Sequence, residues 1–475
     1  MRHGNPRSGW VRASRWLGRR QPEPLAPAPR SFRPPSHSAS SMRSLATPRA
    51  RQAAAAAPRR APARRAGAGR ARFPAPRAAV ATIATTMPSV DSGPFKGVTT
   101  AAQFKAVLEG GAAAGRIAPP LVAGFLDFYQ NYSAAVLGAG GSEATVTAVM
   151  AAIADRVLNQ FSDPYTFPSR HERMTAPYNY YEFGQAYVRE LVDFSKSLVG
   201  HADRFARVAA QLAAGDNVVL LANHQTEADP AVWALLLEGA FPGLATDVAY
   251  VAGDRVVTDP LCKPFSMGRN LFCVHSKKYM DVEPELKEEK QKTNRRTVSA
   301  LSKALGAGGA LLWIAPSGGR DRPSEAGEWR PAPFDPAAVE LMRQLSAKAA
   351  PPGHLWPLAM HSGPMMPPPP AVQKELGERR LTNHVGVGIA LGEELGIDAI
   401  VAGIDEGDRE ARAAAVARAA YEAVVAEYAP LRDAVGAGAG AGGAFSQPWA
   451  ATKKEGKRAR AARAVRQFFG MMSRA

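Results

Sequence analysis

One short stretch places a histidine and an aspartate at a spacing suited to acid–base chemistry. His224 and Asp229 stand five positions apart in the segment that runs from Asn223 to Pro230. If this segment folds back on itself, the carboxylate can bond one imidazole nitrogen and leave the other free. A neutral imidazole held in this way can take a proton from an alcohol near pH 7, and the carboxylate would stabilise the imidazolium that forms.

The same two residues also have a simpler structural interpretation. An aspartate followed by Pro230 and a run of helix-forming residues is typical of a helix N-cap with proline at the first helical position. His224 would then be only a hydrogen-bonded residue at the end of a strand. The local sequence leaves the catalytic and the structural interpretations open.

Basic side chains follow two further apolar runs. Lys277 and Lys278 come after the run 271–274, and Arg320 and Arg322 come after the run 310–315. Such residues can hold a phosphate if their strand ends are neighbours, because Arg offers a planar fork of donors and Lys a point charge. Most Lys and Arg pairs are instead solvated surface. The chain has no GxSxG sequence, which argues against a serine hydrolase of the nucleophile-elbow kind. If an acyl group is transferred here, direct attack by an activated alcohol is simpler than an acyl-enzyme.

Apolar runs alternate with helical patterns from about residue 166 onward. A helical segment is expected from Phe183 to Leu198, before the first of these runs. Strands that alternate with helices predict an α/β domain with a mostly parallel or mixed sheet. Ligands of such sheets lie at the carboxyl ends of the strands, which is where the His224 segment falls. The expected strands are 218–222, 248–252, 271–274, 310–315, 355–360 and 385–391, and the expected helices include 231–238, 296–305, 337–349 and 409–429.

Residues 92–165 predict a small N-terminal helical bundle domain, and residues 166–448 the larger α/β domain. Two apolar faces repeat at helical spacing, and Pro119-Pro120 and the segment 138–141 interrupt the pattern. The first face holds Leu121, Phe125, Phe128 and Tyr132, and the second holds Val146, Val149, Met150, Ile153 and Val157.

The net charge of +17 is concentrated at the two ends of the chain. Residues 1–90 hold 18 Arg and one acid, residues 451–475 hold eight basic residues and one acid, and residues 91–450 carry a net charge of −7. A large nucleic-acid surface on the folded part is therefore disfavoured. Residues 1–88 have the composition of a disordered transit peptide for chloroplast or mitochondrion. A basic arm that binds nucleic acid is the alternative.

A Gly/Ala linker, 435–444, precedes a basic C-terminal tail, 449–475. Apolar residues between Val465 and Met472 recur at helical spacing beside arginines, which suits contact with an anionic membrane or an acidic partner. A solvated tail is an equally open alternative. No apolar run is long enough to cross a membrane. Cys262 and Cys273 lack a metal-binding spacing, so we expect buried thiols in a reducing compartment and no metal site.

Taken together, these stretches resemble a known family. The segment from His224 to Asp229 matches the H-x4-D signature of the glycerolipid acyltransferases. Longer strings, in this order, are similar to the soluble plastid glycerol-3-phosphate acyltransferases, and the resemblance covers about residues 92–449. These strings are 222–230, 251–256, 259–265, 313–323, 331–335 and 446–449.

The resemblance implies a helical domain followed by an α/β catalytic domain in a protein of the chloroplast stroma. It implies transfer of a fatty acyl group from acyl carrier protein, with acyl-CoA as a substitute donor in vitro, to the sn-1 hydroxyl of glycerol 3-phosphate, without a cofactor or metal. A lysophosphatidate acyltransferase that uses the same turn is the sibling alternative.

The resemblance also implies roles for individual residues. His224 would be the general base and Asp229 its orienting carboxylate, while Lys278, Arg320 and Arg322 would hold the substrate phosphate. The chain departs from the family at Tyr279, where the family has a histidine that is counted among the phosphate contacts. A tyrosine can still donate a hydrogen bond but carries no positive charge near neutral pH, which implies weaker binding of glycerol 3-phosphate.

Overall fold

The computed structural model describes residue 88, residues 90–276, residue 280, and residues 284–369, 379–438 and 441–449. All of them fall within one of the two units into which the chain divides, Ala71–Ala475. The segment expected to be a transit peptide lies outside the described residues except for residue 88, as does the basic tail from residue 450 onward. Lys277, Lys278 and Tyr279 also lie outside them.

Three helices open the described chain, as the apolar spacing predicts. They are α1 (Ala101–Ala113), α2 (Pro119–Gly138) and α3 (Glu143–Ser162). Thr100 and Gln103 form a reciprocal capping box at the start of α1, and the Ser142 side chain caps α3. The expected face of α3 is fully buried, and that of α2 is buried except for its partly exposed first member, Leu121.

The nine strands of the described residues form one mixed sheet, which confirms the predicted α/β class. Its order is β1-β5-β4-β6-β3-β7-β8-β2-β9, and the five strands from β5 to β7 run parallel. The pairs β1–β5, β7–β8 and β2–β9 are antiparallel, whereas β8 and β2 run parallel. The strands are β1 (Arg170–His171), β2 (Leu198–Gly200), β3 (Asn217–Ala222), β4 (Ala249–Ala252), β5 (Asn270–Cys273), β6 (Leu311–Ile314), β7 (Gly353–His361), β8 (Gly388–Leu391) and β9 (Phe445–Ser446).

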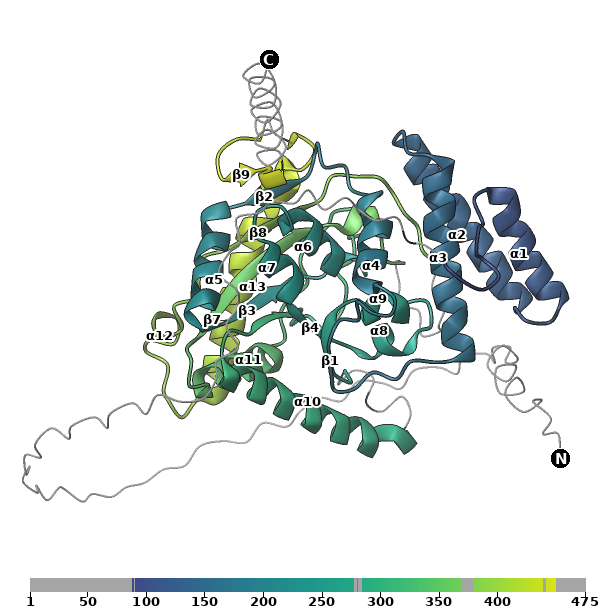
Figure 1. Ribbon diagram of the computed structural model, residues 1–475. Coiled ribbons are helices and arrows are strands. Elements are labelled where there is room, and N and C mark those ends of the chain that lie inside the picture. The colour runs from purple at the N-terminus through teal and green to yellow at the C-terminus, as the bar shows by residue number, and fades with distance from the viewer. Residues whose placement is uncertain are drawn as a thin grey trace, which may run out of the picture. The chain divides into compact units, whose positions relative to one another are not determined.

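Helices cover both faces of the sheet, so the side chains of the buried strands alternate between two cores. Along β3, Val218 and Leu220 join the core of α4 to α7 and the three opening helices, while Val219 and Leu221 join that of α10, α11 and α13. Figure 1 shows α5, α6 and α7 over one face of the strands. The remaining helices are α4 (Tyr180–Arg189), α5 (Ala202–Ala214), α6 (Asp229–Leu237), α7 (Pro242–Asp247), α8 (Asp254–Thr258), α9 (Lys263–Met267), α10 (Lys287–Ala307), α11 (Pro336–Lys348), α12 (Ile397–Ile400) and α13 (Arg409–Ala434), with short 3-10 turns at Pro284–Leu286 and Gly363–Met365.

The prediction of helix from Phe183 to Leu198 was wrong over its second half. The helix α4 ends at Arg189, and Leu198 begins the strand β2. All three residues of β2 pair with β8 on one side, and Val199 and Gly200 pair with β9 on the other. These contacts come from residues far along the chain, so the tertiary environment overrides the local pattern. The strands β1 and β9 were also missed, because two residues are too few to show an alternating pattern.

The strand order brings three loops together at one edge of the sheet. In the parallel centre, β3 lies between β6 and β7, so the segments after these three strands leave the same edge. They begin near residues 223, 315 and 362. Within the described residues, no helix combines the length and apolarity needed to cross a membrane.

A glycine at the end of α9 allows this helix to pack closely against the start of α4. A Cβ atom added at Gly268 would overlap the backbone carbonyl of Tyr180, whereas one added at Gly306, in α10, would meet no atom within 4 Å. We expect Gly268→Ala to lower the free energy of unfolding by about 1–3 kcal/mol through overpacking. Urea unfolding should show this loss. Gly306→Ala is the matched control, and an equal loss in both variants would contradict the packing argument.

Candidate active site

The His224 segment folds back so that its imidazole meets the aspartate. The His224 Nδ1 atom lies 2.8 Å from Asp229 Oδ2, and the backbone N–H of Gln225 donates to the same oxygen at 2.8 Å. The Asp229 side chain is fully buried, whereas 24% of the His224 side chain is exposed. The pair therefore has a solvent-shielded carboxylate and an imidazole that is accessible from outside.

The N-cap interpretation of Asp229 does not describe its contacts. The helix α6 begins at Asp229 itself, and no side chain caps its first turn. The carboxylate instead turns back onto the loop, where it accepts the N–H groups of Gln225 and Thr226 beside His224. Pro230 still favours the first turn of α6. The same short segment therefore starts the helix and places Asp229 against His224.

The loop after β7 completes the surroundings of the aspartate. The Ser362 hydroxyl donates to Asp229 Oδ1, the oxygen that does not face His224. The N–H groups of Ser362 and Gly363 both donate to Gln225 Oε1, at 2.9 and 3.0 Å, and Gln225 Nε2 donates to the Tyr428 hydroxyl of α13 at 3.0 Å. Neighbouring elements thus hold the turn in one conformation.

The loop after β6 is attached to the same turn through Asn223 and Asp321. Asn223 Nδ2 donates to Asp321 Oδ2 at 2.9 Å and to the Met360 carbonyl at 3.0 Å. The Asp321 N–H donates to the His224 carbonyl. Burial raises the pKa of the Asp321 carboxyl to about 6, although hydrogen bonds from Asn223 and the Ala332 N–H act in the opposite direction.

The two described arginines of the expected phosphate site belong to this loop. Arg320 Nη1 lies 3.6 Å from Glu227 Oε1, and Glu227 is itself part of the His224 segment. The Arg322 side chain donates to the Arg320 carbonyl and to the Pro369 carbonyl, each at 3.1 Å. His224, Asp229, Arg320 and Arg322 are therefore brought to one edge of the sheet. Lys278 and Tyr279 lie outside the described residues.

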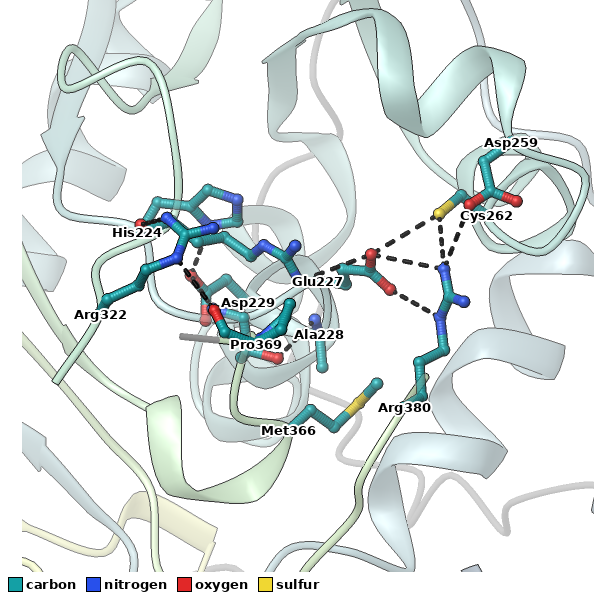
Figure 2. A network of polar contacts seen from close by, with 12 residues as sticks. His224, Glu227, Ala228, Asp229, Asp259, Cys262, Arg322, Met366, Pro369 and Arg380 are labelled. Carbon is teal, nitrogen blue, oxygen red and sulfur yellow. Dashed lines mark hydrogen bonds and ion pairs between the residues drawn. The ribbon is translucent and has the colours of Figure 1, made fainter. Parts of the chain in front are cut away.

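A buried charge network beside this site was missed by the sequence analysis (Figure 2). Arg380 Nε lies 3.0 Å from Glu227 Oε2, and its Nη2 atom lies 3.5 Å from Asp259 Oδ2 and 3.3 Å from Cys262 Sγ. Only 10% of the Arg380 side chain is exposed. Glu227 and Arg380 are separated by 153 positions, so no local pattern could pair them.

The network keeps Glu227 ionised within the protein. Burial raises the pKa of its carboxyl, but the charges of Arg380, Arg320 and Arg255 outweigh this effect and hold the pKa below its usual range. Glu227 is thus a carboxylate shared between the buried Arg380 and the Arg320 of the expected phosphate site.

Cys262 and Cys273 are both free and buried, as predicted. Among the described residues, no group of three or more His, Cys, Asp or Glu side chains is arranged to hold a metal ion. Burial raises the pKa of both thiols, that of Cys273 to about 12, which makes either thiol a poor nucleophile.

The raised pKa of Asp321 predicts a pH dependence of stability. The folded protein keeps this proton where the unfolded chain has lost it, so the stabilisation is complete below pH 3.8 and is lost as the pH rises through about 6. Asp321→Asn cannot ionise and should therefore gain in free energy of unfolding, relative to the parent protein, between about pH 4 and pH 6.5. Urea unfolding across this range measures the difference. Exposed Asp398→Asn should run parallel to the parent, and a parallel Asp321→Asn curve would contradict the prediction.

Two models of known protein families match parts of this chain. A family model described as "Acyltransferase" matches residues 205–361, and one described as "Glycerol-3-phosphate acyltransferase N-terminal" matches residues 92–165. The first of these matches includes His224, Asp229, Arg320 and Arg322.

Curated relatives extend the similarity over most of the chain. The chloroplastic glycerol-3-phosphate acyltransferase of Arabidopsis thaliana is 44% identical over 346 residues, which is 71% of this chain and 75% of that protein. The chloroplastic enzyme of the same name from Pisum sativum is 42% identical over 344 residues, 71% of this chain and 75% of that protein. The corresponding protein of Spinacia oleracea is 45% identical over 335 residues, with shares of 69% and 70%. The expected plastid location is confirmed, and the chain belongs to the chloroplastic glycerol-3-phosphate acyltransferase family.

Proposed function

We propose that this glycerol-3-phosphate acyltransferase moves a fatty acyl group from acyl carrier protein to the sn-1 hydroxyl of glycerol 3-phosphate. Family membership supports the acyltransferase activity toward glycerol 3-phosphate. The carrier-linked donor and the sn-1 position rest on the resemblance of the sequence strings. The product would be 1-acyl-sn-glycerol 3-phosphate, formed without a cofactor.

The observation that carries this proposal is the His224–Asp229 pair at the carboxyl end of β3. A buried carboxylate 2.8 Å from Nδ1 fixes the orientation of the ring and favours the tautomer with its proton on Nδ1. The Nε2 atom is then the basic nitrogen. Because the ring is partly exposed, a bound alcohol can reach it.

The proposed reaction needs no covalent enzyme intermediate. Nε2 of His224 accepts the proton of the hydroxyl as its oxygen attacks the thioester carbon, and the carbonyl electron pair moves onto the thioester oxygen. The Asp229 carboxylate stabilises the imidazolium that results. When the carbonyl re-forms, the C–S bond breaks, and the leaving thiolate takes the proton from the imidazolium. The ester and the free carrier thiol are the products.

The phosphate of the acceptor would bind to the loop after β6. Arg320 and Arg322 are two residues apart on this loop, and its Asp321 N–H is bonded to the His224 carbonyl. An opposite charge at about 4 Å gains roughly 4 kcal/mol at an effective dielectric constant near 20. Lys278 is expected to add a third cation. Phosphate binding at this loop would fix the hydroxyl beside the imidazole and so reduce the entropy lost in the reaction.

Acyl carrier proteins are acidic, so the donor should dock through a local basic surface despite the negative charge of residues 91–450. The basic tail, 449–475, is one candidate for this surface. Peripheral contact with an anionic membrane is the other role that its composition suits. Neither proposal involves nucleic acid.

Removal of the base tests the mechanism. We expect His224→Ala and Asp229→Asn to lower kcat by about 10²- to 10⁴-fold, because general-base catalysis and the orientation of the ring are lost. The assay follows acyl transfer to glycerol 3-phosphate from carrier-linked and CoA-linked donors and identifies the acylated hydroxyl. Undiminished turnover by a folded His224→Ala variant would remove the mechanism.

The chain offers a matched control for this experiment. His354 also contacts carboxylates, with Nδ1 2.6 Å from Glu394 Oε1, but it lies near the start of β7, away from the reactive edge of the sheet. His354→Ala should leave kcat unchanged. Supplying 1-acyl-glycerol 3-phosphate as the acceptor distinguishes the sibling activity, because the proposed enzyme should acylate glycerol 3-phosphate far faster.

The buried network predicts that Arg380 affects substrate binding through Glu227. In Arg380→Gln, Glu227 would lose its nearest cation and would pair more strongly with Arg320, which reduces the attraction for phosphate. We expect the KM for glycerol 3-phosphate to rise several-fold while kcat changes less. Stability should fall by about 3–5 kcal/mol, because a buried charge is left without its main partner. Steady-state kinetics and urea unfolding measure the two effects.

Two further variants test this explanation. Glu227→Gln combined with Arg380→Gln should recover part of the lost stability, since Glu227 no longer carries a charge without its main partner, whereas Asp259 still loses its contact with Arg380. The adjacent Arg379 is largely exposed and pairs with Asp127 at the surface, so Arg379→Gln should leave KM and stability unchanged. A rise in KM of equal size in Arg379→Gln would indicate a general charge effect and would argue against the role given to Glu227.

A further inference from the structure

The helix α10 carries more net positive charge than any other helix of the described residues. Its 21 residues include six basic and two acidic side chains, whereas each of the other α-helices has a net charge of +1 or less. Both acids, Glu288 and Glu289, lie in the first turn, where the helix dipole favours them. The sequence from 290 to 320 holds no acidic residue at all.

Four of the six basic side chains lie on the exposed face of α10. We call these residues the α10 surface: Lys292, Arg295, Arg296 and Lys303. They recur at helical spacing, and the opposite side of the helix is buried through Thr297, Leu301 and Leu305. Figure 1 shows α10 at the periphery of the labelled elements. Glu289 Oε1 lies 4.0 Å from Arg296 Nη1, but such an exposed ion pair is weak, so a partner can compete for the arginine.

Hydrogen bonds hold this part of α10 at the carboxyl end of β5. The Asn294 side chain accepts the N–H of His275 at 2.7 Å and donates to the His275 carbonyl at 2.9 Å. Thr297 Oγ1 donates to the carbonyl of Cys273, the last residue of β5. The strands β5, β4, β6 and β3 are adjacent and parallel, so the carboxyl ends of β5 and β3 are three strand spacings, or about 14 Å, apart. The first three members of the α10 surface therefore lie at the same edge of the sheet as His224.

We infer that the α10 surface is the docking site for the acyl carrier protein that delivers the acyl group. This inference rests on the proposed function, which includes the carrier-linked donor. Acyl carrier proteins are acidic, so a face of exposed cations is complementary to them. Their thioester stands at the end of a flexible prosthetic arm, so the carrier has to bind beside the His224 segment and not over it. A basic surface at the reactive edge, three strands from β3, meets both requirements.

The charge of the remaining body makes a local docking surface necessary. Residues 91–450 carry a net charge of −7, so the body as a whole repels an acidic protein, and a local basic face determines where it approaches. Contacts of this kind act mainly on association and are screened by salt. The α10 surface should therefore control the KM for the carrier-linked donor and leave the chemical step unchanged.

The test reverses three charges of the α10 surface and compares two donors. We expect the triple variant Lys292→Glu/Arg295→Glu/Arg296→Glu to raise the KM for the carrier-linked donor roughly tenfold, with kcat at saturation unchanged. The KM and kcat for the CoA-linked donor should stay close to those of the parent, because this donor lacks the acidic protein. Retained kcat with the CoA-linked donor also shows that the variant is folded. Added salt should lower kcat/KM for the carrier-linked donor more steeply in the parent than in the variant.

A matched control reverses the same number of charges elsewhere. Lys96, Lys105 and Arg116 are exposed residues of the N-terminal helical domain, and replacing all three with Glu changes the net charge by the same amount. This control variant should keep the parent's KM for both donors. An equal rise in KM in the two triple variants would show a general charge effect and would overturn the inference.

Further results would also overturn it. A parent-like KM for the carrier-linked donor in the α10 variant would exclude this docking site. If the same variant also bound vesicles of phosphatidylcholine and phosphatidylglycerol more weakly, α10 would be assigned to the membrane instead. An equal rise in KM for the CoA-linked donor would make α10 a general anion site. The parent protein separates the two levels of the argument: if it cannot use the carrier-linked donor, the proposed donor is wrong, whereas if it can and the α10 variant matches it, only this inference fails.

Discussion

The arrangement of this candidate active site depends on the burial of one carboxylate. Asp229 is fully enclosed and receives hydrogen bonds from backbone N–H groups, from the Ser362 hydroxyl and from His224. An isolated buried carboxylate would be strongly unfavourable, so these donors are a condition of the fold as well as of the chemistry. They come from the turn itself and from the loop after β7. The aspartate therefore ties two loops together while it orients the imidazole.

The second carboxylate of the turn, Glu227, lies between two arginines and lowers the repulsion between them. The proposed phosphate site would gather cations, and cations placed close together in a partly buried space repel one another. Glu227 contacts both Arg320 and Arg380, so it offsets the repulsion between these two cations. Arg380 also contacts Asp259, so its positive charge is shared between two carboxylates. In the proposed function, this balance would hold Arg320 in place and leave the loop after β6 attractive to an anion.

Local patterns predicted the parts of the molecule that are themselves local. Apolar runs such as 218–222 gave the central strands, and helical spacing from Val146 to Val157 gave the buried face of α3. The H-x4-D spacing identified His224 and Asp229, which are only five positions apart in the sequence and contact each other in the structure. Arg380 could not be found this way, since it lies beside another arginine and its partners are 153 and 121 positions away. The strand β2 was also missed, because both of the strands with which it pairs are distant in sequence.

The register of the sheet, more than any loop, sets the geometry of the reactive edge. Leu220 of β3 pairs with Trp313 of β6, and both side chains belong to the same core. A slip of one residue would turn Trp313 to the opposite face and bring Ile314 beside β3 in its place. It would also shift the chain that leads to Arg320 by one residue, about 3.3 Å. Alternating side chains of β3 and β6 fill two separate cores, so such a slip would bury the wrong residues in both of them. The hydrophobic cores thus fix the distance between the imidazole and the arginines.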